Sequence, residues 1–576
     1  MLQINSGKLF TADECRTNAL TGILYSNGRL PNDAPFATEA GTIRGTGFGP
    51  TDAGIVYELE ERIEGSPENG ALISHGVQPY LQDFAIVASF VLGVVVDPSI
   101  DVVRSLTSGK PGFASYDKPG EYVARFFEPR VFIQLAELEG LAAFMTSLIA
   151  LERKYFLGVM RAMRTFTAGL HAIADDLGLA YTLLVSAGES LAQDFDRHET
   201  DWSHVDERKR VAVDKALARA APSTRGAVRK AIVDTEHASL GRRYRAFLID
   251  HIGDAYFRRE GEGRHIPRFE LEEALKQAYG FRSAFIHRSQ RLPDPLRAPY
   301  GHWETTSVER RPVLTFQGLA NLTREAIFEF VRRSPRIERE AYRYQNERAG
   351  IIVMQIAPQH WVFQPLGHAK FARGRVEGVL SLVASMYKRE TGAGMVDLRS
   401  VLAEVEQMLP RAAKTHRPAL LALHFLYNFC APDEYRSEGH VAFREAHFPD
   451  FSQPTSEVLV TATAVGWTWT NSLADHRAMI DRYFAERVRP KGLHAPRLFE
   501  AAMWLDLSER HRAAGDHNEA RILVANAIET LPSEPALRAL EADYAEDREI
   551  RWFKLLCPPP PAPDEAPVSE SPAAEP

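Results

Sequence analysis

The pattern of hydrophobic and polar positions changes near residue 140. Before that point, short apolar runs such as Thr21–Tyr25 and Ala53–Glu60 are separated by turn sequences, among them SNGRLPND and GTGFGPTDAG. Short apolar runs that are regularly interrupted by turn residues are typical of β-structure. We therefore predict a β-rich domain over residues 1–140.

The longest apolar run of the chain lies inside this segment. It covers Phe84–Val96, reads FAIVASFVLGVVV, and is bracketed by Asp83 and Asp97. It falls short of the ~20 residues that a helix needs to span a bilayer. We interpret it as a buried strand or a pair of strands, and we expect no membrane association.

From Leu141 onwards the pattern becomes helical. Gly178 interrupts it, and residues 350–365, GIIVMQIAPQHWVFQP, predict one or two strands instead. The chain end is rich in proline, alanine and acidic residues, which cannot bury enough apolar surface to become ordered. The predicted helices lie within residues 141–176, 180–195, 207–260, 270–290, 315–333, 370–430 and 472–545.

These patterns predict an α+β protein with five segments. The first is the β-rich domain, to which we assign a sensing or regulatory role. The others are an all-α helical domain at 141–340, a mixed, mostly helical linker domain at 341–450, a helical module at 451–556, and a disordered tail at 557–576.

Composition narrows the classes of function. The 576 residues are 45% hydrophobic and 25% charged, as in an ordinary globular protein. Three widely spaced cysteines, Cys15, Cys430 and Cys557, form neither a disulfide framework nor a CxxC metal site. The N-terminus lacks the basic-then-apolar order of a signal peptide, so we expect a cytoplasmic protein.

Charge is distributed unevenly along the chain. The total of 68 Lys and Arg against 76 Asp and Glu gives −8, which would repel nucleic acid if it were evenly spread. Residues 201–300 instead hold 20 basic and 14 acidic residues, a balance of +6, whereas 497–576 hold 8 and 16, a balance of −8. The middle of the chain is thus a candidate to meet a polyanion, with ordinary solvated helix faces as the alternative. A further hypothesis is that the acidic C-terminal region shields the basic centre.

The basic stretch contains Arg282 and His287. Cleaving RNA without a metal needs a group that moves protons at the 2′-OH and the leaving oxygen, and a fixed cation beside the phosphorane. Imidazole suits the first task because it titrates near neutrality, and guanidinium suits the second because its planar fork matches phosphate oxygens. Ten of the 19 histidines have an arginine five to seven residues upstream, so spacing alone does not select this pair. On one helix the two residues would lie about 140° apart around the axis and about 7.5 Å apart along it. They would not share a face, so two copies of the chain brought together would make a better site.

Residues 150–335 resemble the HEPN superfamily, and most closely the subgroup found in ApeA-type bacterial phage-defence proteins. A first helix, Ala180–Leu191, is similar to that subgroup's "alanine, any residue, glutamate, serine, leucine" helix, with Glu189 as the glutamate. A later helix, Lys276–His287, is similar to its "tyrosine, two residues, Arg-Ser, three residues, His". The chain departs from the subgroup at Arg288, where glycine is usual, and at Ser283, where many active members carry asparagine or another stronger polar residue.

The resemblance implies a metal-independent ribonuclease in which the Arg and His of two protomers meet at a dimer interface. Arg282 would clamp the phosphate and His287 would act as acid and base. Ser283 would occupy the polar position after the arginine, and Glu189 would orient or tune the pair. The implied substrate is RNA and the implied assembly is a homodimer, with no cofactor and no metal. The sequence contains no HExxH, GxSxG or Walker A pattern.

A second resemblance lies at residues 501–534. Trp504-x2-Leu507-Ser508-x2-His511, followed by Ala520-x3-Val524-x2-Ala527-x4-Pro532, is similar to a tetratricopeptide repeat, with departures at Ser508, His511 and Val524. An ordinary helical hairpin is the alternative. Because one repeat cannot bury its own face, either version predicts a surface for a protein partner or for dimerisation.

Together these observations predict a metal-independent endoribonuclease that cleaves RNA when triggered, in bacterial antiphage defence. The alternative is a non-catalytic HEPN and tetratricopeptide scaffold or regulator that binds protein or nucleotide partners, which the departures at Ser283 and Arg288 would favour. A third hypothesis is a helical-repeat regulator whose middle domain is only structural.

Overall fold

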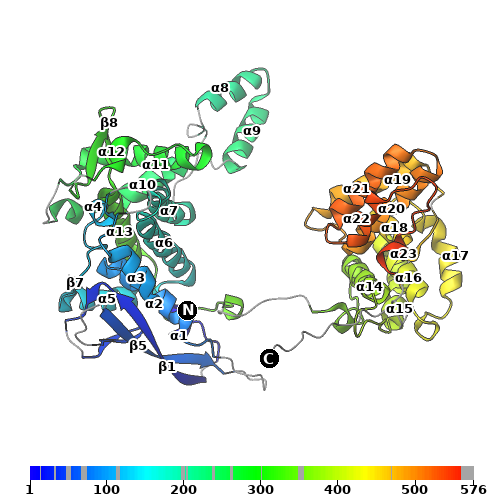
Figure 1. Cartoon of the computed structure of the whole chain (residues 1–576), viewed down its shortest axis with the longest axis horizontal. Helices are drawn as coiled ribbons and strands as arrows, with labels where there is room; N and C mark the ends of the chain where they lie inside the picture. The colour runs from blue at the N-terminus through cyan, green and yellow to red at the C-terminus, as the bar shows by residue number, and fades with distance from the viewer. Residues whose placement is uncertain are drawn as a thin grey trace, which may run out of the picture. The chain divides into compact units, whose positions relative to one another are not determined.

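The computed structural model divides the chain into two compact units, Met1–Val353 and Met354–Pro576, each with its own hydrophobic core (Figure 1). The two units together confirm the α+β class, since the described residues form a small antiparallel sheet near the N-terminus, two pairs of short strands, and many helices. The predicted tail at 557–576 lies, from residue 559 on, outside the described residues. The structure describes residues 1–12, 14–31, 34–46, 53–65, 74–111, 117–195, 202, 205, 207–235, 240–259, 264–299, 301–347, 356–468 and 470–558.

The first unit contains a five-stranded sheet in the order β3-β4-β5-β1-β6. Its two long strands, β1 (Cys15–Ser26) and β5 (Ala53–Glu64), pair antiparallel along their whole length. Alternate residues of β5 are buried, among them Ile55, Tyr57 and Leu59, as expected of a sheet with one covered face. The shorter strands of this unit are β2 (Gly28–Arg29), β3 (Phe36–Thr38), β4 (Gly41–Gly45), β6 (Val96–Asp97), β7 (Val131–Phe132), β8 (Thr305–Val308) and β9 (Arg311–Leu314).

The predicted strand at Phe84–Val96 is wrong, because most of this run belongs to helix α2 (Gln78–Leu92). Pro79 lies in its first turn and Gly93 ends it in the left-handed conformation, at φ 64°. The run is apolar throughout because α2 lies between the sheet and other helices. The Tyr57 ring of the sheet lies 4.6 Å from Phe84 on one side of α2, and the Phe166 ring lies 5.3 Å from Phe90 on another. From Phe84 to Leu92 every residue is buried or half-buried, so this part of the helix has no polar face from which its period could be recognised.

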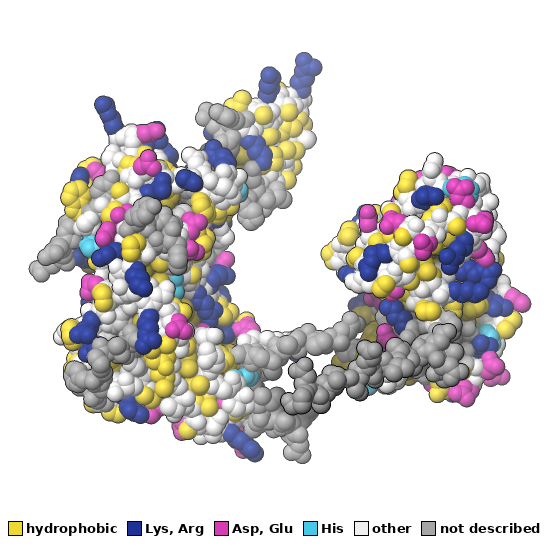
Figure 2. Space-filling view, in the orientation of Figure 1, with side chains coloured by type: hydrophobic (Ala, Val, Ile, Leu, Met, Phe, Trp, Pro, Cys, Tyr) yellow, Lys and Arg dark blue, Asp and Glu magenta, His cyan; other side chains and the backbone are white. Residues whose placement is uncertain are grey.

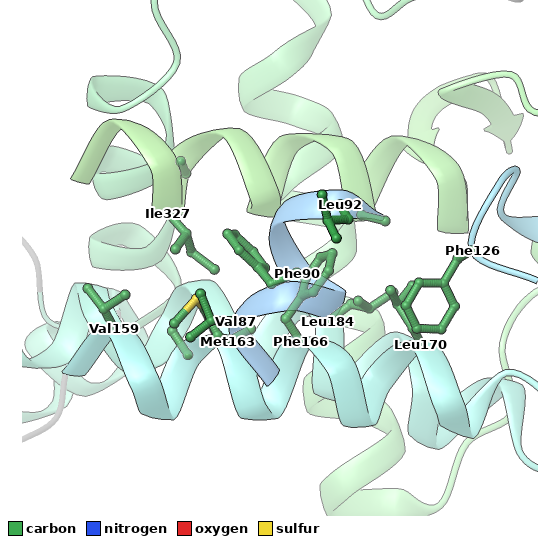
Figure 3. Close-up of a cluster of buried hydrophobic side chains, with 14 of the residues drawn as sticks. Val87, Phe90, Leu92, Phe126, Val159, Met163, Phe166, Leu170, Leu184 and Ile327 are labelled. Atoms are coloured by element: carbon green, nitrogen blue, oxygen red, sulfur yellow. The ribbon is translucent and has the colours of Figure 1, made fainter. Parts of the chain in front are cut away.

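The helices of the first unit continue the same core. Figure 3 shows side chains of α2, α6, α7 and α13 meeting around Phe90. The segments that we predicted as separate, 1–140 and 141–340, therefore lie in one compact unit with a shared core. The remaining helices are α1 (Leu2–Asn5), α3 (Ile100–Thr107), α4 (Pro119–Tyr122), α5 (Leu135–Ala150), α6 (Arg153–Ala172), α7 (Leu177–Phe195), α8 (Glu207–Ala216), α9 (Pro222–Thr235), α10 (Leu240–Asp250), α11 (Leu271–Arg288), α12 (Asp294–Arg297) and α13 (Phe316–Arg333).

Helices α8 and α9 form an insertion in the sequence between α7 and α10. No residue from 209 to 233 is buried, and Figure 1 shows both helices standing away from the other helices of their unit. Asp214 of α8 links them, since it accepts hydrogen bonds from Arg229 of α9 (2.8 Å) and from the Trp202 indole (3.3 Å). Residues 207–235 hold eight Lys and Arg against three Asp and Glu. We call this pair of helices the basic hairpin, and Figure 2 shows Lys and Arg side chains at its outer end and hydrophobic ones along it.

The described residues of the second unit form helices joined by loops, with no strand among them. The strands predicted at 350–365 are wrong for the described part, 356–365, which contains a short 3-10 helix at Pro358–His360. Pro358 starts that turn and removes a donor that a strand ladder would need. The helices of this unit are α14 (Ala372–Tyr387), α15 (Arg399–Met408), α16 (Arg417–Cys430), α17 (His440–Phe451), α18 (Ser456–Val465), α19 (Leu473–Arg487), α20 (Arg497–Ala513), α21 (His517–Thr530), α22 (Pro535–Ala542) and α23 (Trp552–Leu556).

The predicted helical hairpin at 501–534 is confirmed as α20 and α21, which are joined through Gly515 at φ 83°. Ala520 is fully buried, as close approach of the two helices requires. Ser508, which departs from the repeat pattern, donates its hydroxyl to the Ala520 carbonyl at 2.7 Å. The departure therefore fastens the two helices to each other.

Across the described part of the chain, no helix is both long enough and apolar enough to cross a membrane.

Candidate functional site

Helix α11 carries three of the four predicted site residues. Acidic residues in its first turn, Glu272 and Glu273, and basic ones in its last, His287 and Arg288, match the direction of the helix dipole. Ser289 ends the helix with φ 50°. The helix packs along α7, and α10 also lies against it.

Contacts at two points set the position of α11 on α7. The Phe281 ring lies edge-on to Tyr181 of α7, with ring centroids 6.3 Å apart. Further along, the Phe285 ring comes so close to Gly178 that a Cβ built there would lie 2.4 Å from it. Gly178 therefore has a packing role at the start of α7, and the face of α11 toward α7 is determined by apolar contacts.

The structure brings together Glu189 and Arg282, two residues that the resemblance assigns to one site. Glu189 lies in α7 with its side chain only 3% exposed, and its Oε2 is 2.7 Å from Nη2 of Arg282. Its second oxygen, Oε1, accepts a hydrogen bond from the Tyr279 hydroxyl at 3.1 Å. A carboxylate in this surrounding needs such partners, because an unpaired buried charge is strongly unfavourable. Glu189 thus holds two side chains of α11 that are three residues apart.

Two tyrosines complete the surroundings of the pair. The Arg282 guanidinium carbon lies 5.6 Å from the centre of the Tyr279 ring, and Tyr244 of α10 lies 5.7 Å from the same ring. Burial raises the pKa of Tyr279 to about 12, and the Glu189 charge adds to this effect. Burial also raises the pKa of Tyr244 well above its ordinary value, with smaller contributions from Tyr181 and Glu189. Both phenols therefore stay protonated at neutral pH.

Arg282 keeps hydrogen-bonding capacity beyond its contact with Glu189. Its side chain is 17% exposed, and its buried Nε has no hydrogen-bond partner among the described residues. A guanidinium carries five N–H groups in a fixed fork. The arrangement thus presents an oriented cation with unused donors, which is the chemistry that suits an anionic oxygen.

The structure does not bring His287 to this cluster. His287 is exposed, five residues beyond Arg282 on the same helix, and therefore about 140° around it and about 7.5 Å along its axis. Ser283 is half-buried and lies next to Arg282 in the chain. Within the described residues, neither His287 nor Ser283 has a side-chain hydrogen bond to Glu189 or Arg282. One chain therefore assembles the arginine with the glutamate and leaves the histidine on another face of α11.

A second buried carboxylate, Glu304, organises a nearby part of the unit. It is 2% exposed and accepts hydrogen bonds from Arg259 (2.6 Å), Asn321 (2.9 Å) and Tyr256 (3.0 Å), and from the Ile266 amide (3.0 Å). These hydrogen bonds and the Arg259 charge outweigh burial, so the pKa of Glu304 lies below its ordinary value. With this many partners we assign Glu304 a structural role, because it joins the segment after α10 to α13.

Sequence reasoning missed the roles of Tyr244 and Glu304. Tyr279 was inside the recognised motif, but no function was assigned to it. Its signal was available in the sequence, since a residue three positions before Arg282 lies on the same side of a helix. Tyr244 and Glu304 gave no comparable signal, because their partners are distant in sequence. No group of three His, Cys, Asp or Glu side chains suited to a metal ion occurs among the described residues.

Comparison of the chain with protein-family models, with curated proteins and with solved structures gives no match.

Proposed function

We propose that this chain is a metal-independent endoribonuclease that acts as a homodimer through residues 150–335, in the cytoplasm and in antiphage defence. The observation that supports this proposal most is the buried ion pair between Glu189 and Arg282. It orients a guanidinium at the position that the HEPN resemblance assigns to the phosphate clamp. The same ion pair supports the orienting role that the resemblance implies for Glu189.

In the proposed reaction, the 2′-oxygen of a ribose attacks the adjacent phosphorus while the bond from phosphorus to the 5′-oxygen breaks. His287 takes the proton from the 2′-OH and returns a proton to the leaving 5′-oxygen. Arg282 stabilises the negative charge on the phosphorane oxygens. The products are a 2′,3′-cyclic phosphate and a 5′-hydroxyl. The proposed reaction needs no oxidant, reductant or metal.

A second copy of the chain is part of the proposal because of where α11 places its side chains. Arg282 lies toward α7, whereas His287 is exposed at the end of the helix. If α11 of one copy faces α11 of another, each exposed His287 can approach the partner's clamp. A monomer lacks this juxtaposition, so activity is expected to rise with the fraction of dimer.

The basic hairpin supports RNA as the substrate. Its eight Lys and Arg against three Asp and Glu give +5, and no residue from 209 to 233 is buried. Such a surface attracts a phosphate backbone without reading its sequence. We assign the hairpin to RNA capture and the α11 site to cleavage.

RNA cleavage by purified full-length protein in EDTA tests the proposal. Wild type, Arg282→Lys and His287→Ala are compared, with two controls at exposed residues, Arg332→Ala on α13 and His360→Ala in the second unit. We expect His287→Ala to lose at least about 100-fold in rate, since general acid–base catalysis contributes about 10²–10⁴. Arg282→Lys should also lose about 100-fold, since removing one oriented donor to the transition-state charge typically costs about 10²–10³. The controls should match wild type. Equal cleavage by His287→Ala and wild type would refute the site, and a strict requirement for a divalent metal would refute the mechanism.

A non-catalytic scaffold is the second candidate, and one observation favours it. The structure leaves His287 apart from Arg282, and the Glu189–Arg282 pair is adequately explained as a buried structural ion pair. In that case His287→Ala would retain full biological activity. Variants that break the Glu189–Arg282 pair would then lower biological activity only by destabilising the fold.

A further inference from the structure

The second unit contains a cavity that the proposed function does not use. It has a volume of about 810 Å³ and lies between helix α20, the residues after α18 and the start of α23. Three aromatic residues line it, Trp467, Trp552 and Phe553, and we call these three its aromatic wall. Asp506 of α20 lies among the lining residues.

Asp506 differs from the other charged groups of this cavity. Glu509 is bound by Arg512 (2.6 Å) and accepts the Ile550 amide (2.8 Å), and Glu549 pairs with Arg551 (2.6 Å). Among the described residues, Asp506 has no hydrogen-bond or ion-pair partner.

The remaining cation of the lining, Arg510, is directed elsewhere. Its Nη1 donates to Asn471 (3.2 Å) and lies 3.1 Å from Nδ1 of His476, and its Nη2 donates to the Asn471 carbonyl. It therefore leaves the carboxyl of Asp506 without a counter-charge.

Burial raises the pKa of Asp506 to about 8. The carboxyl is therefore mostly protonated at neutral pH when the cavity is empty. A cation placed beside it would favour the ionised form and draw the proton off. A neutral ligand would not.

We propose that this cavity binds a guanidinium group, which pairs with Asp506 and stacks on the aromatic wall of Trp467, Trp552 and Phe553. Guanidinium fits better than ammonium because it is planar, stacks on aromatic faces and meets a carboxylate with two parallel hydrogen bonds. The site would therefore take an arginine side chain of a peptide or a free arginine-like molecule. This inference does not depend on the ribonuclease proposal, since the cavity lies in the other unit.

Calorimetric titration of the full-length protein tests the proposal with defined probes. N-acetyl-L-arginine amide presents the side chain as a peptide would, and free L-arginine presents it with two further charges. N-acetyl-L-citrulline amide has the same shape without the charge, and N-acetyl-L-lysine amide has an ammonium. We expect binding of the arginine amide to be at least tenfold tighter than that of the citrulline and lysine compounds. The tighter of the two arginine probes identifies the source of the ligand.

Two variants and one proton count separate this site from unspecific binding. Asp506→Asn should weaken the arginine amide at least tenfold, and Phe553→Ala, at a side chain 46% exposed, should weaken it severalfold. Asp543→Asn, at an exposed position, should bind as wild type does. Titrations at pH 7 in buffers of different ionisation enthalpy should show release of about one proton in wild type and none in Asp506→Asn. Equal binding of the arginine, lysine and citrulline compounds, unchanged affinity in Asp506→Asn, or no binding of either arginine probe would overturn the proposal.

Discussion

Removing Arg282 while leaving Glu189 in place is the sharpest perturbation of the candidate site. The Glu189 side chain is 3% exposed, and Arg282 supplies its only ion pair among the described residues. Breaking a buried pair by removing one partner typically costs about 3–5 kcal/mol, because a charge stays buried without compensation. Since Tyr279 keeps its hydrogen bond to Oε1, we expect Arg282→Ala to cost about 3 kcal/mol.

Removing the charge of Glu189 while leaving Arg282 in place should destabilise the fold less. Arg282 is 17% exposed, so in Glu189→Gln its guanidinium can turn toward water, at a cost of about 1–2 kcal/mol. The double variant Glu189→Gln/Arg282→Ala has no buried charge left unpaired. It should therefore be more stable than the sum of the single effects predicts, by at least about 1 kcal/mol.

Urea unfolding combined with hydrogen exchange measures this cycle. Because the chain has two units, a single global transition is not assumed, and peptides from α7 and α11 report on the unit that holds the pair. In Arg282→Ala, the loss of protection from hydrogen exchange should be confined to peptides of the first unit. Strictly additive single and double effects, or an Arg282→Ala variant within 0.5 kcal/mol of wild type, would show that the pair does not support α11.

Three further predictions concern other parts of the chain. Asp506 has a folded-state pKa of about 8 against an ordinary 3.8, so the folded state binds more protons between these values, and stability should fall as pH rises from about 4 to about 8. Asp506→Asn should remove this dependence, at most about 1.4 kcal/mol per pH unit, in thermal unfolding from pH 4 to 8, and an unchanged pH dependence would contradict the assignment. Ser508→Ala should destabilise the α20–α21 hairpin by about 1 kcal/mol in urea unfolding, because it removes the bond to the Ala520 carbonyl, whereas no change would mean that the bond is dispensable. Lys215→Gln/Lys230→Gln on the basic hairpin should weaken RNA binding and reduce the slope of log affinity against log salt by about 2, and an unaltered slope would place the RNA elsewhere.

Helices were predicted best from the sequence where one face is apolar and the opposite face is polar. Helices α11 and α13 begin and end within two residues of the predicted ranges 270–290 and 315–333, whereas α7 begins three residues before the predicted 180–195. Helix α13 begins after Thr315, whose hydroxyl caps the helix by accepting from the Gly318 amide. The prediction failed for α2, because an apolar run without exposed residues has the same composition as a central strand. Length was the available clue, since 15 residues exceed an ordinary strand.

The candidate site was predicted in part for a similar reason. Glu189 and Arg282 could be paired from the resemblance, and the structure brings them together. The position of His287 relative to Arg282 follows from helix geometry alone and was expected. Tyr244 could not be found from the sequence, since only the packing of α10 against α11 brings its ring to Tyr279. Contacts of this kind depend on tertiary structure, which local sequence patterns do not indicate.

The central claim, that this chain cleaves RNA with Arg282 and His287, is tested most directly by the chemistry of the cut ends. Labelled RNA is incubated in EDTA with wild-type protein and with His287→Ala, at concentrations that span dimer formation, and the new ends are analysed. We expect 2′,3′-cyclic phosphate and 5′-hydroxyl ends from wild type, in amounts that rise with the dimer fraction, and no cleavage by His287→Ala. Identical ends and rates from the two proteins, or no cleavage by the wild-type dimer, would contradict it.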